Sequence, residues 1–350
     1  MNHLLKHNTQ SLCTLPVILL LVMCIALLAS CSKAPSNSNI TYTERLGNTV
    51  NAKNVKPKRV EQLKLLPPSQ LNKNTVTLGI LQLAGLGHCK LNILISEHNN
   101  QLGKTATAAG RLKYQISFIQ SAQACLNTLD KNSDIYSKIL AAKTQKENHL
   151  IQYFNSMLFN EPELNRTWAG TNNELSTQAA GFSDTQQALS QLVTIKQHIT
   201  SREFSKINTD SIFIALEQLN KYQFNQLLIQ SARQQIAFNN SATSFVKTLN
   251  LRDICPTGKN KKTAKIVSNV FQKFFLGEIQ PYQAQLTGYL EVLQPLYNQL
   301  WFKEEITSEP INDLTKTNSP NNLLNQLKNS AKNHVVWWQT FYKTCEISPI

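Results

Sequence analysis

Apolar residues recur at intervals of three and four positions over most of the chain beyond residue 75, and polar residues fill the positions between them. This is the period of an α-helix with one buried face. Strict alternation of apolar and polar residues, which is typical of half-buried strands, is scarce. The pattern therefore predicts an all-α protein. Its clearest helical face consists of Leu112, Ile116, Ile119, Ala122 and Leu126.

Capping and helix-breaking residues divide this pattern into separate helices. Ser133-Asp134 is a typical helix start, and Asn160-Glu161-Pro162 ends that helix. Asp184 starts another helix that extends to about residue 203. Helices joined by short and medium loops predict an irregular multi-helix bundle. The other expected helices are 42–51, 88–98, 109–128, 209–250 with Asp210 as cap, 262–303 with breaks at Pro281 and Pro295, and 320–345, and the loops are 99–110, 165–184, 251–261 and 306–321.

The N-terminus has the pattern of a targeting segment. Lys6 precedes an apolar run from Leu15 to Ala29, which is shorter than the ~20 residues of a spanning helix and suits a secretory signal. The run ends in Leu28-Ala29-Ser30-Cys31, which resembles the lipobox of bacterial lipoproteins. That resemblance implies cleavage before Cys31 and lipidation of its thiol. The alternative is a plain signal peptide that is followed by Cys31 by chance.

These features divide the chain into three parts. Residues 1–30 are expected to be a signal peptide that is removed, and residues 31–41 a lipidated cysteine and a short flexible tether, because the segment is small, polar and contains proline. Residues 42–350 are expected to form a single helical domain, partly extended over 42–75. Ser32 follows the lipobox cysteine in place of the Asp that retains such proteins in the inner membrane of well-studied Gram-negative bacteria. The expected location is therefore the cell envelope, lipid-anchored at the outer membrane and facing the periplasm.

Composition supports a folded and basic body. The chain has 350 residues, of which 41% are hydrophobic and 16% charged, and this balance argues against wholesale disorder. The formal net charge is +14, with seven basic residues between Arg45 and Lys73 and a second cluster at 259–265. Because a lipoprotein meets little nucleic acid, the expected partners are anionic lipid headgroups, lipopolysaccharide phosphates, acidic peptidoglycan groups or an envelope protein. The alternative is a solvated basic face without a partner.

Four cysteines remain after removal of the signal peptide and lipidation of Cys31. They are Cys89, Cys125, Cys255 and Cys345, and an even number in an oxidising compartment predicts two disulfides with three connectivities open. The leading hypothesis pairs them sequentially. One geometric difficulty concerns Cys89 and Cys125. If residues 88–98 and 109–128 form two antiparallel helices, the distances of these cysteines from the turn differ by about eight residues, or roughly 12 Å, which is too far for a disulfide. No spacing matches a zinc site, and neither a metal nor a cofactor is expected.

Several short segments carry a further resemblance. They are similar to the domain of unknown function 3080 family, an uncharacterised family of Gram-negative lipoproteins. The sequence departs from the family pattern at His98, Asn100 and Gln101, and Gln115 replaces an acid after Tyr114. The resemblance implies lipidation, a periplasmic setting and a disulfide role for the cysteines, and it implies no activity. The segments are 42–46, the block from Cys89 to Cys125, Cys255-Pro256, Asn269-Val270-Phe271, Ile279-Gln280-Pro281-Tyr282 and Trp338-Gln339 with Cys345.

No strong catalytic motif is present in the sequence, and we assign no catalytic residue. Polar residues at the end of one predicted helix and beside one predicted kink are candidates for a ligand site. Helix capping and proline kinks are the structural alternatives. The candidates are Glu97, Asn99, Gly103, Tyr114, Gln280 and Tyr282.

Three functions are compatible with these features. The first is a lipid-anchored binding or scaffold protein of the cell envelope, which is favoured by the lipobox and the basic body. The second is an envelope enzyme that acts on peptidoglycan or a related polymer, with Glu97 in an acid–base pair inside a concave pocket. The third is a carrier of lipid or lipopolysaccharide with an apolar cavity inside the bundle.

Overall fold

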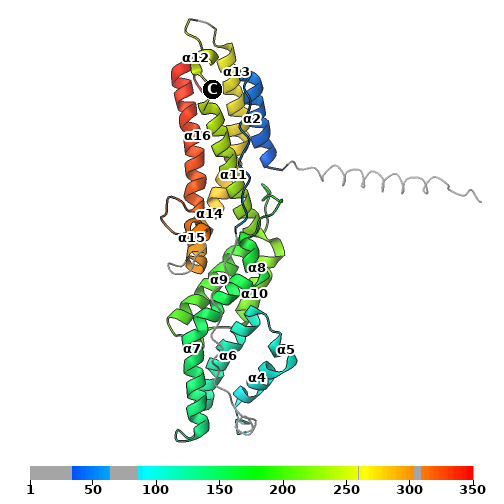
Figure 1. Cartoon of the computed structure of the whole chain (residues 1–350), viewed down its shortest axis with the longest axis vertical. Helices are drawn as coiled ribbons and strands as arrows, with labels where there is room; N and C mark the ends of the chain where they lie inside the picture. The colour runs from blue at the N-terminus through cyan, green and yellow to red at the C-terminus, as the bar shows by residue number, and fades with distance from the viewer. Residues whose placement is uncertain (1–33, 64–84, 88, 259, 303–308, 350) are drawn as a thin grey trace, which may run out of the picture.

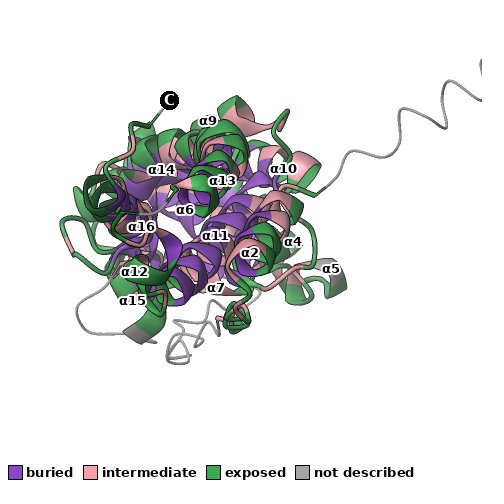
Figure 2. Cartoon of the chain, turned by 90° about the horizontal axis from the view of Figure 1, so that it is seen from above, coloured by how far each residue is buried: buried purple, intermediate pink, exposed green. Residues whose placement is uncertain are grey.

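The computed structural model describes residues 34–63, 85–87, 89–258, 260–302 and 309–349. The predicted signal peptide, Cys31 and the extended chain near Pro67-Pro68 lie outside these ranges. The described residues form helices joined by loops, with no strand among them, so the predicted all-α fold is confirmed. The molecule is elongated, and its helices run mostly along the long axis (Figure 1). Seen from one end, the buried residues lie on the inner faces of the helices (Figure 2).

The lower end in Figure 1 is built from residues between 85 and 160. Cys89 and Cys125 form a disulfide there, with a Cα–Cα distance of 5.5 Å. The buried side chains of Leu91, Phe118 and Ile139 join these helices in one hydrophobic cluster. The helices are α4 (Lys90–Asn99), α5 (Gln101–Lys104), α6 (Ala108–Leu126) and α7 (Asp134–Asn160).

The middle of the molecule holds the largest hydrophobic cluster. Trp168 packs edge-on against Tyr297 and Trp301 within it, and the three ring centroids are 5.4 to 6.0 Å apart. The first part of α6, the last turns of α7, the first half of α11 and the first turns of α16 also contribute to this cluster. Its elements are α8 (Pro162–Asn165), η1 (Arg166–Trp168), α9 (Phe182–Thr200), η2 (Phe204–Lys206), α10 (Asp210–Tyr222), α11 (Phe224–Lys247), α14 (Gln280–Trp301) and α15 (Glu309–Thr315).

The upper end contains the N-terminal helix and the last helix side by side with the second half of α11 (Figure 1). A second disulfide joins Cys255 to Cys345, also with a Cα–Cα distance of 5.5 Å. The sequential pairing of the four cysteines is therefore the one in the structure. The elements are α2 (Ser36–Val50), α12 (Leu251–Ile254), α13 (Lys262–Val270), η3 (Phe271–Ile279) and α16 (Leu323–Cys345).

The connection between α4 and α6 removes the geometric difficulty with the first disulfide. Cys89 stands directly before α4, and Cys125 lies in the last turn of α6. Residues 100–107, which include the one-turn helix α5, join the two helices. Extended chain covers about 3.3 Å a residue, so this connection spans the offset of roughly 12 Å between the cysteines.

Three predicted boundaries need correction. The region 209–250 is two helices, because Gln223 adopts a left-handed conformation (φ 51°) between them, and Asp210 is the first helical residue after the cap Thr209. The region 262–301 is helical without a break, since Pro281 lies in the first turn of α14 and Pro295 is accommodated inside that helix. The nine residues before this turn are π-helical.

The third correction concerns the predicted tether. Helix α2 begins at Ser36, so residues 36–41 of the expected tether are helical. The backbone N–H of Ser36 donates a hydrogen bond to the Glu174 carboxylate (2.8 Å), and the buried Asn39 exchanges two hydrogen bonds with Gln235. These tertiary contacts stabilise a segment whose Ser and Asn residues have weak helix propensity.

A buried polar network joins α2 to the centre of the upper end. From Gln235 it continues to Asn239, whose amide N–H groups donate to Gln283 and Ser330, both at 3.0 Å. Nearby, the Tyr42 hydroxyl lies 2.7 Å from Nε2 of His334, and Trp338 donates to that hydroxyl. Because buried polar groups need partners, this network fixes the position of α2 on the bundle.

Candidate functional site

The first four candidate residues lie together at the lower end, at the junction of α4, α5 and α6. Glu97 and Asn99 are exposed at the end of α4. A Cβ on Gly103 would lie only 2.5 Å from the Glu97 carbonyl oxygen, so this glycine permits a close approach of two backbones. Tyr114 stacks on the imidazole of His98, with centroids 3.6 Å apart. These contacts close the end of α4, which corresponds to helix capping, the structural alternative to a ligand site.

A lysine from α7 occupies the aromatic surface beside Tyr114. The Lys146 ammonium lies 4.9 Å from the centroid of Tyr114 and 4.7 Å from that of Phe118, and it donates to the Gln115 side chain at 2.7 Å. Burial lowers the pKa of Lys146 to about 8 and raises the pKa of Tyr114 to about 12. The rings are thus covered by the chain's own cation. Sequence reasoning missed Lys146, because it lies 31 residues beyond Gln115 on another helix.

The other two candidate residues lie elsewhere. Gln280 is exposed at the start of α14, whereas Tyr282 is buried and its hydroxyl donates to the Leu175 carbonyl at 2.9 Å. Tyr282 lines a groove of about 840 Å³ beside the first turn of α2. Glu97, Asn99 and Tyr114 do not line this groove, so the six candidates do not form one site.

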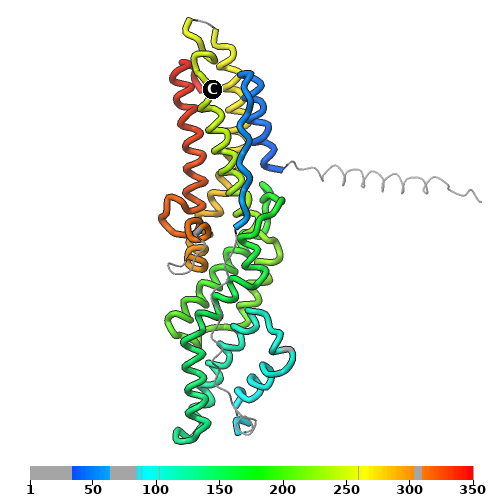
Figure 3. Tube along the Cα trace, viewed as in Figure 1, coloured from blue at the N-terminus to red at the C-terminus, as the bar shows by residue number. Residues whose placement is uncertain are grey.

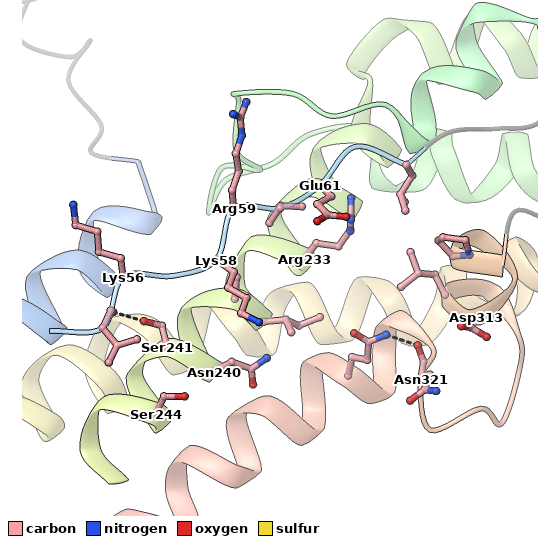
Figure 4. Close-up of a pocket in the computed structure, with 18 residues that line it drawn as sticks. Lys56, Lys58, Arg59, Glu61, Arg233, Asn240, Ser241, Ser244, Asp313 and Asn321 are labelled. Atoms are coloured by element: carbon pink, nitrogen blue, oxygen red, sulfur yellow. Dashed lines mark hydrogen bonds between the residues drawn. The ribbon is translucent and has the colours of Figure 1, made fainter. Parts of the chain in front are cut away.

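A different groove collects cationic side chains. It has a volume of about 850 Å³ and lies between the segment 52–63 and helices α11, α15 and α16 (Figure 4). We call the segment 52–63 the basic segment, because it contributes three cations to the groove lining, and α11 contributes a fourth. Apolar side chains of α11, α15 and the segment, neutral polar side chains, and the carboxylates of Glu61 and Asp313 complete the walls. The cations are Lys56, Lys58, Arg59 and Arg233.

The sequence explains why the basic segment is extended. Asn51 takes a left-handed conformation (φ 52°) that ends α2, and the backbone N–H of Ala52 donates to the Gly47 carbonyl. Pro57 disfavours a new helix at this point. The Val55 carbonyl accepts a hydrogen bond from the Ser241 hydroxyl, and Leu63 packs on the central hydrophobic cluster. The segment is therefore held at both ends across α11.

The cations point in two directions (Figure 4). The Lys58 side chain extends into the groove toward Asn240, and the Arg233 guanidinium lies beside the Glu61 carboxylate. Burial lowers the pKa of Arg233, and the negative charge of Glu61 partly opposes this shift. Lys56 and Arg59 project away from the groove. Within the described ranges, none of the four cations forms a hydrogen bond or a salt bridge with another residue.

A second cavity lies on the other side of the basic segment. It has a volume of about 550 Å³ and is lined by Lys58, Arg59 and Gln62 together with Gly170 and Gln234. The basic segment thus bridges two hollows. The run of basic residues between Arg45 and Lys73 was visible in the sequence, whereas the groove was not, because its other wall comes from residues 233–244 and 310–326.

The described residues contain no group of three His, Cys, Asp or Glu side chains that could hold a metal ion. No helix in the described part of the chain is both long and apolar enough to cross a membrane.

Fold and site together define an all-α, two-disulfide protein with a groove lined by cations. The chain belongs to the family described as protein of unknown function DUF3080, whose model matches residues 39–349. The match begins inside α2 and includes the basic segment and both disulfides. No curated protein and no solved structure matches the chain.

Proposed function

We propose that the protein is a lipid-anchored binding protein of the cell envelope, held at the outer membrane through Cys31, and that the groove beside the basic segment binds its ligand. The observation that carries the binding site is the pair Lys58 and Arg233. Both line a groove of about 850 Å³, and neither forms a salt bridge within the described ranges. A groove of this size suits a ligand, and Lys58 and Arg233 can each bind an anionic group beside the carboxylates of Glu61 and Asp313, which line the same groove.

The groove lining indicates the chemistry of the ligand. Arg233 and Lys58 can each contact a carboxylate or a phosphate, and the guanidinium can do so through two parallel hydrogen bonds. Ser241, Ser244 and Asn240 offer neutral hydrogen-bonding groups nearby. Apolar side chains such as Ile236 form part of the same wall. This lining suits an elongated ligand that carries an acidic group, and peptidoglycan peptides and lipopolysaccharide both contain such groups.

The enzyme alternative, which assigned acid–base chemistry to Glu97, gains no support from the described cavities. Glu97 is exposed, and it does not line the grooves of about 850 and 840 Å³ or the cavity of about 550 Å³. The basic groove is a better basis for a functional test.

A photo-crosslinking residue at Ser244, inside the groove, tests the proposed function in living cells. A matched probe replaces the exposed Lys131 at the lower end of the molecule. We expect one reproducible envelope component to crosslink to position 244, not to position 131, and to be lost with Lys58→Glu or when Cys31→Ala removes the anchor. The same crosslinking pattern at both positions, or no adduct at position 244, would overturn the proposed binding site.

A further inference from the structure

The first described residues lie close to the proposed lipid anchor along the chain. Ala34 follows Cys31 by three residues, and extended chain spans at most about 3.6 Å a residue. The Cα atoms of these two residues are therefore no more than about 11 Å apart. If Cys31 is lipidated, as the proposed function requires, the surface around the start of α2 lies next to the bilayer.

The start of α2 is fixed on the body. The Ser36 backbone N–H donates to Glu174, and the Ser38 hydroxyl donates to Glu278 at 2.7 Å. Glu174 also places a negative charge at the positive end of the helix dipole. Together with the buried Asn39, these contacts leave α2 little freedom to pivot. The direction in which the chain leaves the body is therefore set by the fold.

The basic segment lies on the same face as the start of α2. It runs antiparallel beside α2 and passes the level of the first turn of that helix (Figure 3). Gln234 and Phe238 of α11 line a small cavity with Ser36, and the same two residues line the 550 Å³ cavity with Arg59. The start of α2 and the basic segment thus flank one stretch of α11. We call this surface the anchor face.

Two cations project from the anchor face into solvent. Lys56 and Arg59 are exposed and point away from the groove, and neither pairs with a described carboxylate. Anionic lipid headgroups complement this charge, and a basic residue near a charged membrane strengthens binding by about fivefold. The short distance to Cys31 favours a membrane over a free polymer, because a surface held this close to the anchor meets lipid first.

We infer that the anchor face lies against the membrane, with Lys56 and Arg59 in contact with anionic headgroups. This inference rests on the proposed lipid anchor. It places the groove, on the other side of the basic segment, beside the membrane surface. The protein is therefore oriented on the bilayer by its own charges as well as tethered to it.

Vesicle binding by the mature chain, residues 31–350, with Cys31→Ser tests the contact without any lipid on the protein. The vesicles contain phosphatidylethanolamine and phosphatidylglycerol, and pure phosphatidylcholine vesicles are the neutral control. We expect salt-sensitive binding to the anionic vesicles alone. Lys56→Gln with Arg59→Gln should weaken this binding by about 25-fold, from two contacts of about fivefold each.

The matched control removes two positive charges from the lower end. Lys104→Gln with Lys131→Gln changes the net charge equally, and both residues are exposed. Equal weakening by both pairs would show an effect of net charge and overturn the inference. Binding to purified peptidoglycan without binding to anionic vesicles would overturn it as well.

Lipidation of Cys31 is measured separately, as incorporation of an alkyne-labelled fatty acid into the wild-type protein and into Cys31→Ala. If Cys31 carries the label but the unlipidated protein does not bind anionic vesicles, the inferred orientation on the membrane is wrong and the proposed function stands. No label at Cys31 overturns the proposed anchor.

Discussion

At the residue scale, His334 is the most strongly perturbed basic group in the described upper end. Its ring nitrogens face the Tyr42 hydroxyl at 2.7 Å and the Thr243 hydroxyl at 3.3 Å, and Trp338 also points at Nε2. Burial disfavours the imidazolium and lowers the pKa of His334 to about 3. The folded protein therefore holds this histidine neutral at every pH above that value.

The depressed pKa of His334 predicts sensitivity to acid. Between pH 6.5 and 3 the unfolded chain binds a proton at this residue and the folded chain does not, so stability falls as the pH falls. The effect is up to about 1.4 kcal/mol for each pH unit in that window. We expect His334→Gln to remove this part of the slope in urea unfolding measured from pH 7 to 4. An identical slope in wild type and variant would contradict the assignment.

Lys146, whose ammonium donates to Gln115, is a second group with a shifted pKa, and one substitution at Gln115 can change that pKa. Gln115→Glu places a carboxylate where the amide now accepts from the ammonium. Opposite charge favours protonation, so the pKa of Lys146 should rise from about 8 toward its ordinary value. NMR titration of labelled lysine measures this shift. The exposed Gln123→Glu on the same helix is the control, and an equal shift in both variants would contradict a direct contact.

At the scale of elements, the helices differ in what holds them together. Helix α6 packs through apolar side chains and a few separate polar contacts, whereas α2, α11, α14 and α16 are also joined by one continuous buried amide network. Such a network fixes the register of helices because each amide has only a few satisfactory partners. The register of α2 is thus specified by Asn39 and Tyr42.

Asn239 is the centre of that network. Asn239→Ala leaves Gln235 and Gln283 short of partners, and we expect the free energy of unfolding to fall by about 2 to 3 kcal/mol. The neighbouring Asn240 is exposed, and Asn240→Ala should change stability by no more than about 0.5 kcal/mol. Chemical denaturation of both variants tests this, and similar small losses would show that the network contributes little.

The two disulfides close loops of different length. The sequence separation is 36 residues for Cys89–Cys125 and 90 residues for Cys255–Cys345. On the chain-entropy model each bridge contributes about 4 kcal/mol, and the longer loop contributes more. We expect Cys255→Ala with Cys345→Ala to be the more destabilising pair in urea unfolding. The reverse order would show that local packing outweighs loop entropy.

Sequence patterns predicted the elements better than the site. Ser133 caps α7 as expected, and its hydroxyl accepts from the Tyr136 backbone N–H, because capping depends on neighbours within three residues. The helical segment 36–41 escaped prediction because its partners, Glu174 and Gln235, lie more than 130 residues away. The groove escaped prediction for the same reason, since Arg233 meets the basic segment only in the folded chain.

At the scale of the whole molecule, the elongated body has one face that joins the proposed anchor to the proposed binding site. Helix α2 leads directly into the basic segment, and the basic segment borders the groove. A ligand in the groove would therefore be held close to the membrane. This arrangement links the location of the protein to its proposed binding role.

The N-terminal peptide of the mature protein provides the most direct test, because the envelope role depends on the lipid anchor. Mass spectrometry of protein purified from outer membranes should find a chain that begins at Cys31 and carries acyl groups, and Cys31→Ala should abolish both. A mature chain that begins at another residue, or one that begins at Cys31 without lipid, would contradict the account.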